Sequence, residues 1–322
     1  MDMTTIQIHV VIPGWCSTVQ DLGRYGYQRY GVSVAGAMDK FSMVVANRLV
    51  GNTDDSAVLE VTLKGPELEF DEDTHIAITG ADLSPTISGK RVPLWESIEV
   101  LGGSALSFGK QRAGARSYLA IAGGIDVPLI LGSRSTHCAS ETGGLNGRPL
   151  QQGDVLHTGP LRQSAGVLMG KRLPDQLVPR YEKTTTLRFI PGPQHNLFPS
   201  TAVTILTSSS YTVTPESNRM GYRLTGQKVV RKRPGHFISD CTTVGALQIP
   251  DDGQPILLMA DRQTTGGYPK IGCVITADLP LAAQLAPGNF ITFSLTTVPQ
   301  AQAALRKQHA LLDAALAPTD RA

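Results

Sequence analysis

The feature that most constrains the fold is a series of short apolar segments in which alternate residues are polar or small. Ile6, Ile8 and Val10 alternate with polar residues, and Ile76 and Ile78 follow the same rule. A period of two is typical of strands with one buried face. The 33 glycines and 21 prolines interrupt these segments at frequent intervals. The pattern therefore predicts a mainly β protein, built as an antiparallel sandwich or barrel.

Only three helices are expected. The first covers residues 39–50, with Asp39 as the N-cap and Gly51 directly after its end. The second is short and begins at an Asp278 cap, and the third is the alanine-rich stretch 300–316. The helices are thus minor additions to a β framework.

The two halves of the chain share three landmarks in the same order. These are R-x-G-Y at 24–27 and 219–222, Ala-Asp at 81–82 and 260–261, and Gly-x-x-Leu/Ile-x-Phe at 103–108 and 288–293. The shared order predicts two tandem copies of one β unit. We assign an N-terminal barrel domain to residues 1–165 and a C-terminal barrel domain with a final helix to residues 185–322. The polar stretch 162–186 is the expected linker, and the barrel that residues 112–160 join is left open.

Composition and missing motifs exclude several classes of function. With 29 basic and 27 acidic residues, the chain lacks the positive excess of a nucleic-acid binder. It has no long apolar run for a membrane span and no signal peptide, and its four cysteines are widely spaced, so a cytoplasmic protein is expected. The segment 103–110 has five residues where a phosphate loop has four. The histidines form no i, i+4 pair for a metal and no biotin acceptor is visible, so no covalent cofactor and no metal site are expected in this chain.

Three polar, glycine-containing runs lie among the strands, at 20–24 with 36–39, at 132–136 and at 261–270. Each is compatible with ordinary turns. The third surrounds Gly266-Gly267 with an acid, two bases, an amide, two hydroxyls and a phenol, a set that suits a carboxylate, amide or phosphate ligand. Because it follows an apolar strand, we expect it to line a pocket, with Arg24 or Arg219 close to Asp261.

Nine motifs, spread in order over residues 10–295, resemble one family of proteins. They are Thr18-Val-Gln-Asp-Leu-Gly-Arg24, Gly36-Ala-Met-Asp39, Ala46-Asn-Arg-Leu-Val-Gly-Asn52, Leu59-Glu60, Arg116-Ser-Tyr-Leu-Ala-Ile-Ala-Gly-Gly124, Leu131-Gly-Ser-Arg-Ser-Thr136, Asn218-Arg-Met-Gly-Tyr-Arg-Leu224, Gly245-Ala-Leu-Gln-Ile-Pro250 and Asp261-Arg-Gln-Thr-Thr-Gly-Gly-Tyr-Pro-Lys270. The family is that of the biotin-dependent-carboxyltransferase-like, or allophanate hydrolase subunit 2, proteins. Its members include the C subunit of bacterial 5-oxoprolinase, the regulator KipA and part of urea carboxylase.

The resemblance implies two cyclophilin-like β-barrel domains. It also implies a small-molecule substrate and protein partners, namely a subunit-1 or KipI-like protein and a lactam-utilisation subunit. Activity would depend on ATP with Mg²⁺ at the level of the complex, because opening a lactam requires activation of an unreactive amide. The resemblance supplies no established set of catalytic residues, so the site residues below are chosen by position and chemistry.

Opening an activated amide needs cations near developing negative charge and a carboxylate near a transferable proton. The candidate catalytic residues are Asp261, Asp39 and Glu60. The candidate substrate-binding residues are Arg24, Arg219, Arg223, Gln263, Thr264, Thr265, Tyr268, Lys270, Ser133, Ser135 and Thr136. Arg24 and Arg219 have an equally plain structural interpretation, in which they pair with carboxylates to fix the two barrels.

Three functions are compatible with these motifs. The first is a subunit of an ATP-dependent 5-oxoprolinase, which opens 5-oxoproline to glutamate and is active only with its partner subunits. The second is a carboxyltransferase component that acts on urea or a similar amide with a biotin-bearing partner. The third is a KipA-type regulator that binds a KipI-like inhibitor of a sensor kinase.

Overall fold

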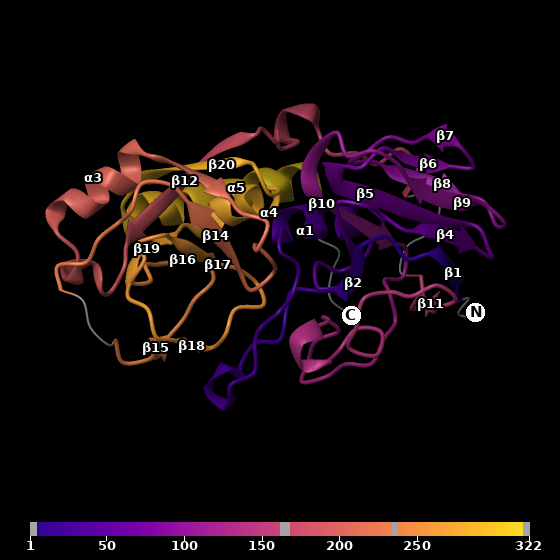
Figure 1. Cartoon of the computed structure of the whole chain (residues 1–322). Helices are drawn as coiled ribbons and strands as arrows, with labels where there is room; N and C mark the ends of the chain where they lie inside the picture. The colour runs from indigo at the N-terminus through magenta and orange to yellow at the C-terminus, as the bar shows by residue number, and fades with distance from the viewer. Residues whose placement is uncertain (1–4, 162–167, 234–236, 318–322) are drawn as a thin grey trace. The chain divides into compact units, whose positions relative to one another are not determined.

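The computed structural model describes residues 5–161, 168–233 and 237–317, which divide into two compact units (Figure 1). The first unit runs from the start of the chain to Arg24, continues over Ala35–Arg180 and takes the end of the chain from Ala310 on. The second unit consists of Tyr25–Val34 and Tyr181–His309. A cyclophilin-like fold for each half stays a prediction, as do the domain bounds 1–165 and 185–322.

The strands of the first unit form two antiparallel sheets. The six-stranded sheet has the order β11-β1-β4-β9-β6-β7, and the five-stranded sheet has the order β2-β3-β10-β5-β8. Their bounds are β1 Gln7–Ile12, β2 Cys16–Gln20, β3 Val58–Thr62, β4 Glu67–Phe70, β5 Thr74–Asp82, β6 Pro85–Ile87, β7 Lys90–Arg91, β8 Ser97–Val100, β9 Ala105–Phe108, β10 Ala113–Ile121 and β11 Val155–His157. Residues 112–160, which the sequence could not assign, therefore belong to the first unit and give it both a central and an edge strand.

The core of the first unit lies between its two sheets. Val10 of β1 and Phe70 of β4 come from the larger sheet, and Ile76 and Ile78 of β5 from the smaller one, and all four are buried in one apolar cluster. The alternation read from the sequence thus marks the inward face of each strand. The unit is built as a sandwich, with 3₁₀ turns at Cys138–Ser140 and Asp175–Leu177.

Helix α1, Lys40–Leu49, covers part of the smaller sheet and packs on β5 and β10. Its start agrees with the prediction, because Asp39 is the N-cap and its carboxylate accepts a hydrogen bond from the Ser42 amide at 2.9 Å. Gly51, directly after the cap residue Val50, has a φ of 71°, which a glycine adopts without strain.

The second unit is a closed barrel of seven strands in the order β12-β19-β16-β17-β14-β13-β20. The barrel closes where β12 pairs in parallel with β20, and its other pairs are antiparallel. The strand bounds are β12 Thr184–Pro191, β13 Ser210–Val213, β14 Gly221–Thr225, β16 Ala246–Gln248, β17 Ile256–Leu258, β19 Lys270–Val274 and β20 Phe290–Leu295. A separate two-stranded ribbon pairs β15, Asp240–Cys241, with β18, Thr265–Gly266.

Aromatic side chains fill the barrel. Phe189 and Phe293 meet edge to face with ring centroids 6.1 Å apart, and the Tyr211 ring lies 5.9 Å from that of Phe293. All three are at most 2% exposed. Such pairs contribute about 1 kcal/mol beyond their burial. The barrel is therefore a packed core, and ligands must bind on its outside or at its ends.

The helices of the second half agree with the sequence in part. Helix α4, Leu279–Ala283, begins after Asp278 as expected, but the Asp278 carboxylate binds the Arg188 guanidinium instead of capping the helix. Helix α5, Val298–Ala315, agrees with the predicted C-terminal helix. Helix α3, Ser200–Ser208, was not predicted, because its serines and threonines are weak helix formers. Further 3₁₀ turns lie at Gln28–Tyr30, His195–Leu197 and Thr276–Asp278.

The mainly β fold is confirmed, but the landmarks that predicted a repeat lie on differently paired elements. Residues 24–27 lie in a connection after β2, whereas residues 219–222 lead into β14 of the barrel. Likewise, residues 103–108 end in β9, which has two antiparallel neighbours, whereas residues 288–293 enter β20, which has one parallel neighbour. These landmarks thus lie on differently paired strands, and the tandem duplication stays a prediction.

The expected linker is also more ordered than its composition indicates. Residues 162–167 lie outside the described residues, but the amide of Ser97 donates to the carbonyl of Lys171 and β12 already begins at Thr184. Within the described ranges, no helix combines the length and the apolar character needed to cross a bilayer.

Candidate functional site

The polar run 261–270 begins where β17 ends, as the apolar segment before it predicted. The Asp261 carboxylate accepts hydrogen bonds from Nε and Nη2 of Arg219, both at 2.8 Å. The two side chains are only 8% and 11% exposed. A bidentate guanidinium–carboxylate pair of this kind is strong and fixes both partners. Each oxygen of Asp261 thus accepts a hydrogen bond from Arg219, which gives Asp261 a positioning role, and its predicted catalytic role stays a prediction.

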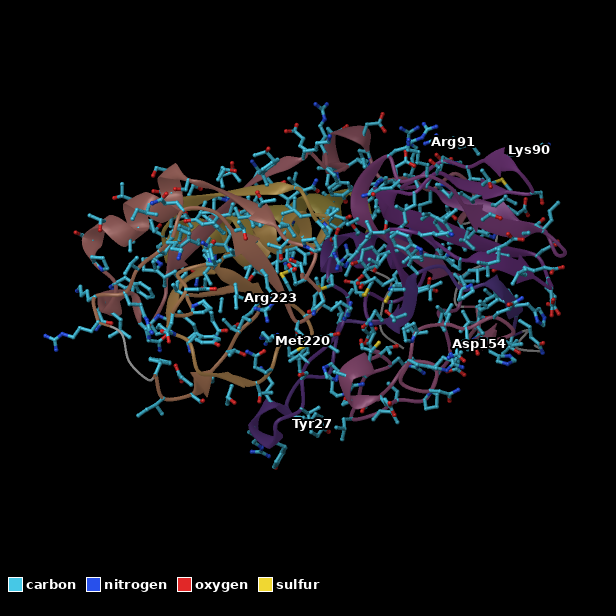
Figure 2. All side chains as sticks on the ribbon, in the orientation of Figure 1. Tyr27, Lys90, Arg91, Asp154, Met220 and Arg223 are labelled. Atoms are coloured by element: carbon cyan, nitrogen blue, oxygen red, sulfur yellow. The ribbon has the colours of Figure 1, made fainter. Side chains whose placement is uncertain are left out.

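A pocket of about 160 Å³ opens beside this pair in the second unit. Among the predicted residues, Arg223, Gln263 and Tyr268 line it. The other lining residues are Glu216, Asn218, Met220, Gly221, Gln248, Ile256 and Leu258. Met220 and Arg223 lie on the segment that leads into β14 and on β14 itself (Figure 2). The pocket therefore combines apolar side chains with a guanidinium, three carboxamides, a carboxylate and a phenol.

Gln248 is a pocket residue that the sequence did not single out. It ends β16, is 1% exposed, and its amide nitrogen donates to the carbonyl of Tyr268 at 3.4 Å. Asn218 was likewise missed, although both belong to the motifs that carry the family resemblance. Their place in these motifs was the sequence signal that could have identified them as site residues. Only the pairing of the strands in the barrel shows that both line one pocket.

The remaining residues of the run hold the ribbon of β15 and β18. Lys270 Nζ donates to the Asp240 carboxylate and to the Cys241 carbonyl, each at 2.7 Å. This hydrogen bond to Lys270 lowers the pKa of Asp240 to about 2. The Thr264 carbonyl accepts from the Thr242 amide, and Thr265 lies within β18 with an exposed side chain. Lys270 is thus engaged within the chain, and its role in binding a substrate stays a prediction.

Two predicted catalytic carboxylates, Asp39 and Glu60, belong to the first unit and form what we call the buried carboxylate network with Tyr118. The Tyr118 hydroxyl donates to Glu60 Oε2 at 2.8 Å and accepts from the Asp39 amide at 2.8 Å. All three residues are at most 1% exposed. Burial and the neighbouring carboxylates raise the pKa of Tyr118 well above its ordinary value. Glu60 is thus bound by Tyr118, and the Asp39 carboxylate by Ser42 at the start of α1, so both carboxylates have structural partners and their catalytic role stays a prediction.

A second group of predicted residues closes loops of the first unit. Ser133 Oγ donates to the Asp21 carboxylate at 2.7 Å, and the Ser135 hydroxyl donates to the same oxygen. Arg24 donates to two backbone carbonyls at 3.0 and 2.9 Å, and Thr136 Oγ1 donates to a third at 2.9 Å. Each of these side chains is buried. These contacts with carbonyls support the structural interpretation of Arg24.

The fold and these motifs together define a class of protein. Residues 30–295 match the family described as the carboxyltransferase domain, subdomain A and B, and the chain belongs to this family. Among its relatives, the C subunit of 5-oxoprolinase from Escherichia coli is 37% identical over 94% of this chain and 95% of that protein. The Haemophilus influenzae protein of the same name is 36% identical over 92% of this chain and 94% of its own length.

A solved structure shows the same fold. The crystal structure of the K. lactis urea amidolyase superimposes with a TM-score of 0.89 at 33% identity and covers 100% of this chain. This chain spans 20% of that protein's length. The predicted resemblance is thus confirmed by sequence and by structure.

Proposed function

We propose that this chain is the C subunit of a 5-oxoprolinase, which opens 5-oxoproline to glutamate together with partner subunits. The observation that carries the proposal is the identity of 36–37% to two proteins named as the C subunit of 5-oxoprolinase, along nearly the full length of both. An end-to-end match of this kind supports the same place in a complex. The expected partners are a subunit-1 or KipI-like protein and a lactam-utilisation subunit, in the cytoplasm.

The chemistry of the pocket supports a small amide that carries a carboxylate. The Arg223 guanidinium suits a carboxylate, because its N–H groups match the two oxygens. The carboxamides of Gln248 and Gln263 each offer a donor and an acceptor, which is the complement of a lactam N–H and C=O. Ile256 and Leu258 supply apolar contacts for the ring. Asp261 fixes Arg219 and thereby the turn that carries Gln263.

The segment of this chain that resembles a phosphate loop does not have the form of one. Residues 105–108 of the phosphate-loop-like segment form strand β9, so no cradle of backbone amides is present there. The described residues also contain no group of three or more metal-ligating side chains. We propose that ATP with Mg²⁺ acts at the level of the complex, and we assign no phosphoryl step to this chain.

A second function is favoured by the fold comparison. The TM-score of 0.89 to the urea amidolyase structure supports a carboxyltransferase component that acts on urea or a similar amide with a biotin-bearing partner. Urea is a carboxamide without a carboxylate, so this function would use the glutamines of the pocket and not Arg223. The two functions therefore differ in their dependence on Arg223.

The test is to co-express the chain with the subunits encoded beside it and to measure glutamate released from 5-oxoproline, with and without ATP. We expect ATP-dependent release by the complex and none by the isolated chain. The Gln263→Ala complex is expected to show a KM for 5-oxoproline about tenfold higher, since one hydrogen bond to the ligand is lost. The exposed Gln152→Ala serves as the matched control and should be unchanged. No glutamate from the complex, together with urea-dependent carboxyl transfer from a biotinylated partner, would favour the second function.

A further inference from the structure

Arg262 is a buried cation for which the described part of the chain provides no anion. It directly follows Asp261 and is only 7% exposed. Its Nε is closed off from solvent and has no hydrogen-bond partner among the described residues. None of the ion pairs within the described residues includes Arg262. Burying a guanidinium without an anion to pair with it costs free energy of folding. The presence of a buried Arg262 therefore needs a physical explanation.

Arg219, which lies beside Asp261, is a nearby guanidinium that does have an anionic partner. Arg219 donates two hydrogen bonds of 2.8 Å to Asp261, the residue next to Arg262. The carboxylate next to Arg262 in the sequence is thus already bound by another arginine. Asp261 therefore pairs with Arg219, which is partly exposed, while the buried Arg262 forms no ion pair within the described residues.

The other titratable groups beside Arg262 do not neutralise it. They are the Tyr25 phenol and the Cys273 thiol. Burial raises the pKa of Cys273 to about 11, so the thiol carries no charge at neutral pH. Burial also lowers the pKa of the Arg262 guanidinium, as expected for a cation without an anion.

The backbone holds Arg262 in place. Its amide donates to the Met259 carbonyl at 3.3 Å, and its carbonyl accepts from Ser33 Oγ at 2.9 Å. Ser33 belongs to the segment 25–34, which is part of the second unit. Because these hydrogen bonds hold its backbone, the Arg262 cation is pre-organised. Binding of an anion would therefore cost little conformational entropy.

We propose that Arg262 is an anion-binding residue whose ligand is a small oxyanion, a carboxylate or a phosphate. The proposal is separate from the pocket lined by Arg223 and does not depend on the function proposed above. The planar guanidinium offers parallel N–H groups that match two oxygens of either ligand. The remaining exposure of 7% leaves access for a small molecule.

The first test measures the thermal midpoint of the full chain at constant ionic strength with 5-oxoproline, glutamate or inorganic phosphate, with chloride as the control anion. We expect at least one oxyanion to raise the midpoint of the wild type and chloride to have no effect. The part of this rise that is due to Arg262 should disappear in Arg262→Met and persist in Arg223→Met, which removes the guanidinium of the separate pocket. Calorimetric titration then identifies the source, because the carboxylate or the phosphate with the lower Kd is the ligand, and Arg262→Lys should weaken its binding about tenfold or more.

The second test compares arginine variants without ligand. Arg262→Met should leave the thermal midpoint unchanged or higher, because it removes a buried charge that nothing compensates. Arg219→Met should lower it, because the buried Asp261 loses its partner. The exposed Arg306→Met should do neither. A midpoint of Arg262→Met as low as that of Arg219→Met would overturn the proposal, since it would reveal an internal partner. If no oxyanion raised the thermal midpoint of the wild type, the proposal would be overturned as well. Weaker assembly of Arg262→Met with the partner subunits would then indicate that a carboxylate of a partner protein pairs with Arg262.

Discussion

Each unit contains a buried carboxylate, and the surroundings of the two carboxylates differ. In the first unit Glu60 accepts hydrogen bonds from the Tyr118 hydroxyl and the Met38 amide, both at 2.8 Å, and Arg116 lies 3.8 Å from its other oxygen. In the second unit Asp261 is bound by Arg219, and a pocket and an uncompensated arginine lie beside this pair. The same residue types thus produce a closed network in one unit and an open site in the other.

The difference follows from the position of each carboxylate on its strand. Glu60 lies in the middle of β3, which has β2 and β10 as neighbours, and it faces Tyr118 directly across the sheet. Asp261 lies beyond the end of β17, where the ladder stops. A side chain in the middle of a central strand is covered on all sides, whereas a strand end borders the surface and can meet a ligand.

The largest expected effect comes from breaking the closed network. Glu60→Ala should reduce the free energy of unfolding by about 3–5 kcal/mol, because Arg116 loses its buried partner and two donors lose their acceptor. Urea denaturation monitored by circular dichroism measures the change. Glu69→Ala, on the exposed face of β4, is the control and should shift the free energy by less than about 0.5 kcal/mol. Equal stability of the two variants would show that the network is not a structural element.

Removing only the phenolic oxygen should have an intermediate effect. Tyr118→Phe keeps the ring but leaves the Asp39 amide without its acceptor and Glu60 with one donor fewer, at a cost of about 1–3 kcal/mol. The raised pKa of Tyr118 adds a pH dependence. Its contribution is fully present below the ordinary tyrosine value of 10.0 and is lost as the pH rises from there toward the higher folded value. The wild type should therefore lose stability above pH 10 more steeply than Tyr118→Phe.

The smallest effect concerns the ribbon of β15 and β18 in the second unit. The pKa of Asp240 is lowered to about 2 from an ordinary value of 3.8. The contribution of its pair with Lys270 is therefore present above pH 3.8 and is lost as the pH falls through about 2. Hydrogen exchange at the Thr242 amide, corrected for the intrinsic rate, should show weaker protection over this range. In Asp240→Asn the protection should not change between these pH values, and a wild type that behaves like this variant would contradict the prediction.

The local features of the fold could be predicted from the sequence. The Asp39 cap, the glycine after α1 and the alternating faces of β1 and β5 depend on residues close together in the chain. The same holds for the run 261–270 at the end of a buried strand, which lines the pocket through Gln263 and Tyr268. Periodicity and turn chemistry report on such short stretches directly.

The features that depend on distant pairing could not be predicted. Whether Glu60 is free or covered depends on Tyr118, which reaches it from another strand of the sheet. Lys270 was assigned to a substrate because its partner Asp240 lies on the ribbon, which no pattern indicated. In the same way, one half of the sequence forms a closed barrel and the other two sheets, although their short strands look alike.

The parallel pairing of β12 with β20 has a consequence for the synthesis of the protein. The hydroxyls of Thr186 and Thr292 meet at 2.8 Å across this seam, although 106 residues separate them. Contacts of such long range form slowly, because a large loop must be closed before they stabilise anything. While the ribosome is still producing the strands in between, β12 has no partner on this side and its edge is open to other chains. The barrel that carries the pocket can close only after β20 has emerged. We therefore expect chaperones to bind this unit during its synthesis.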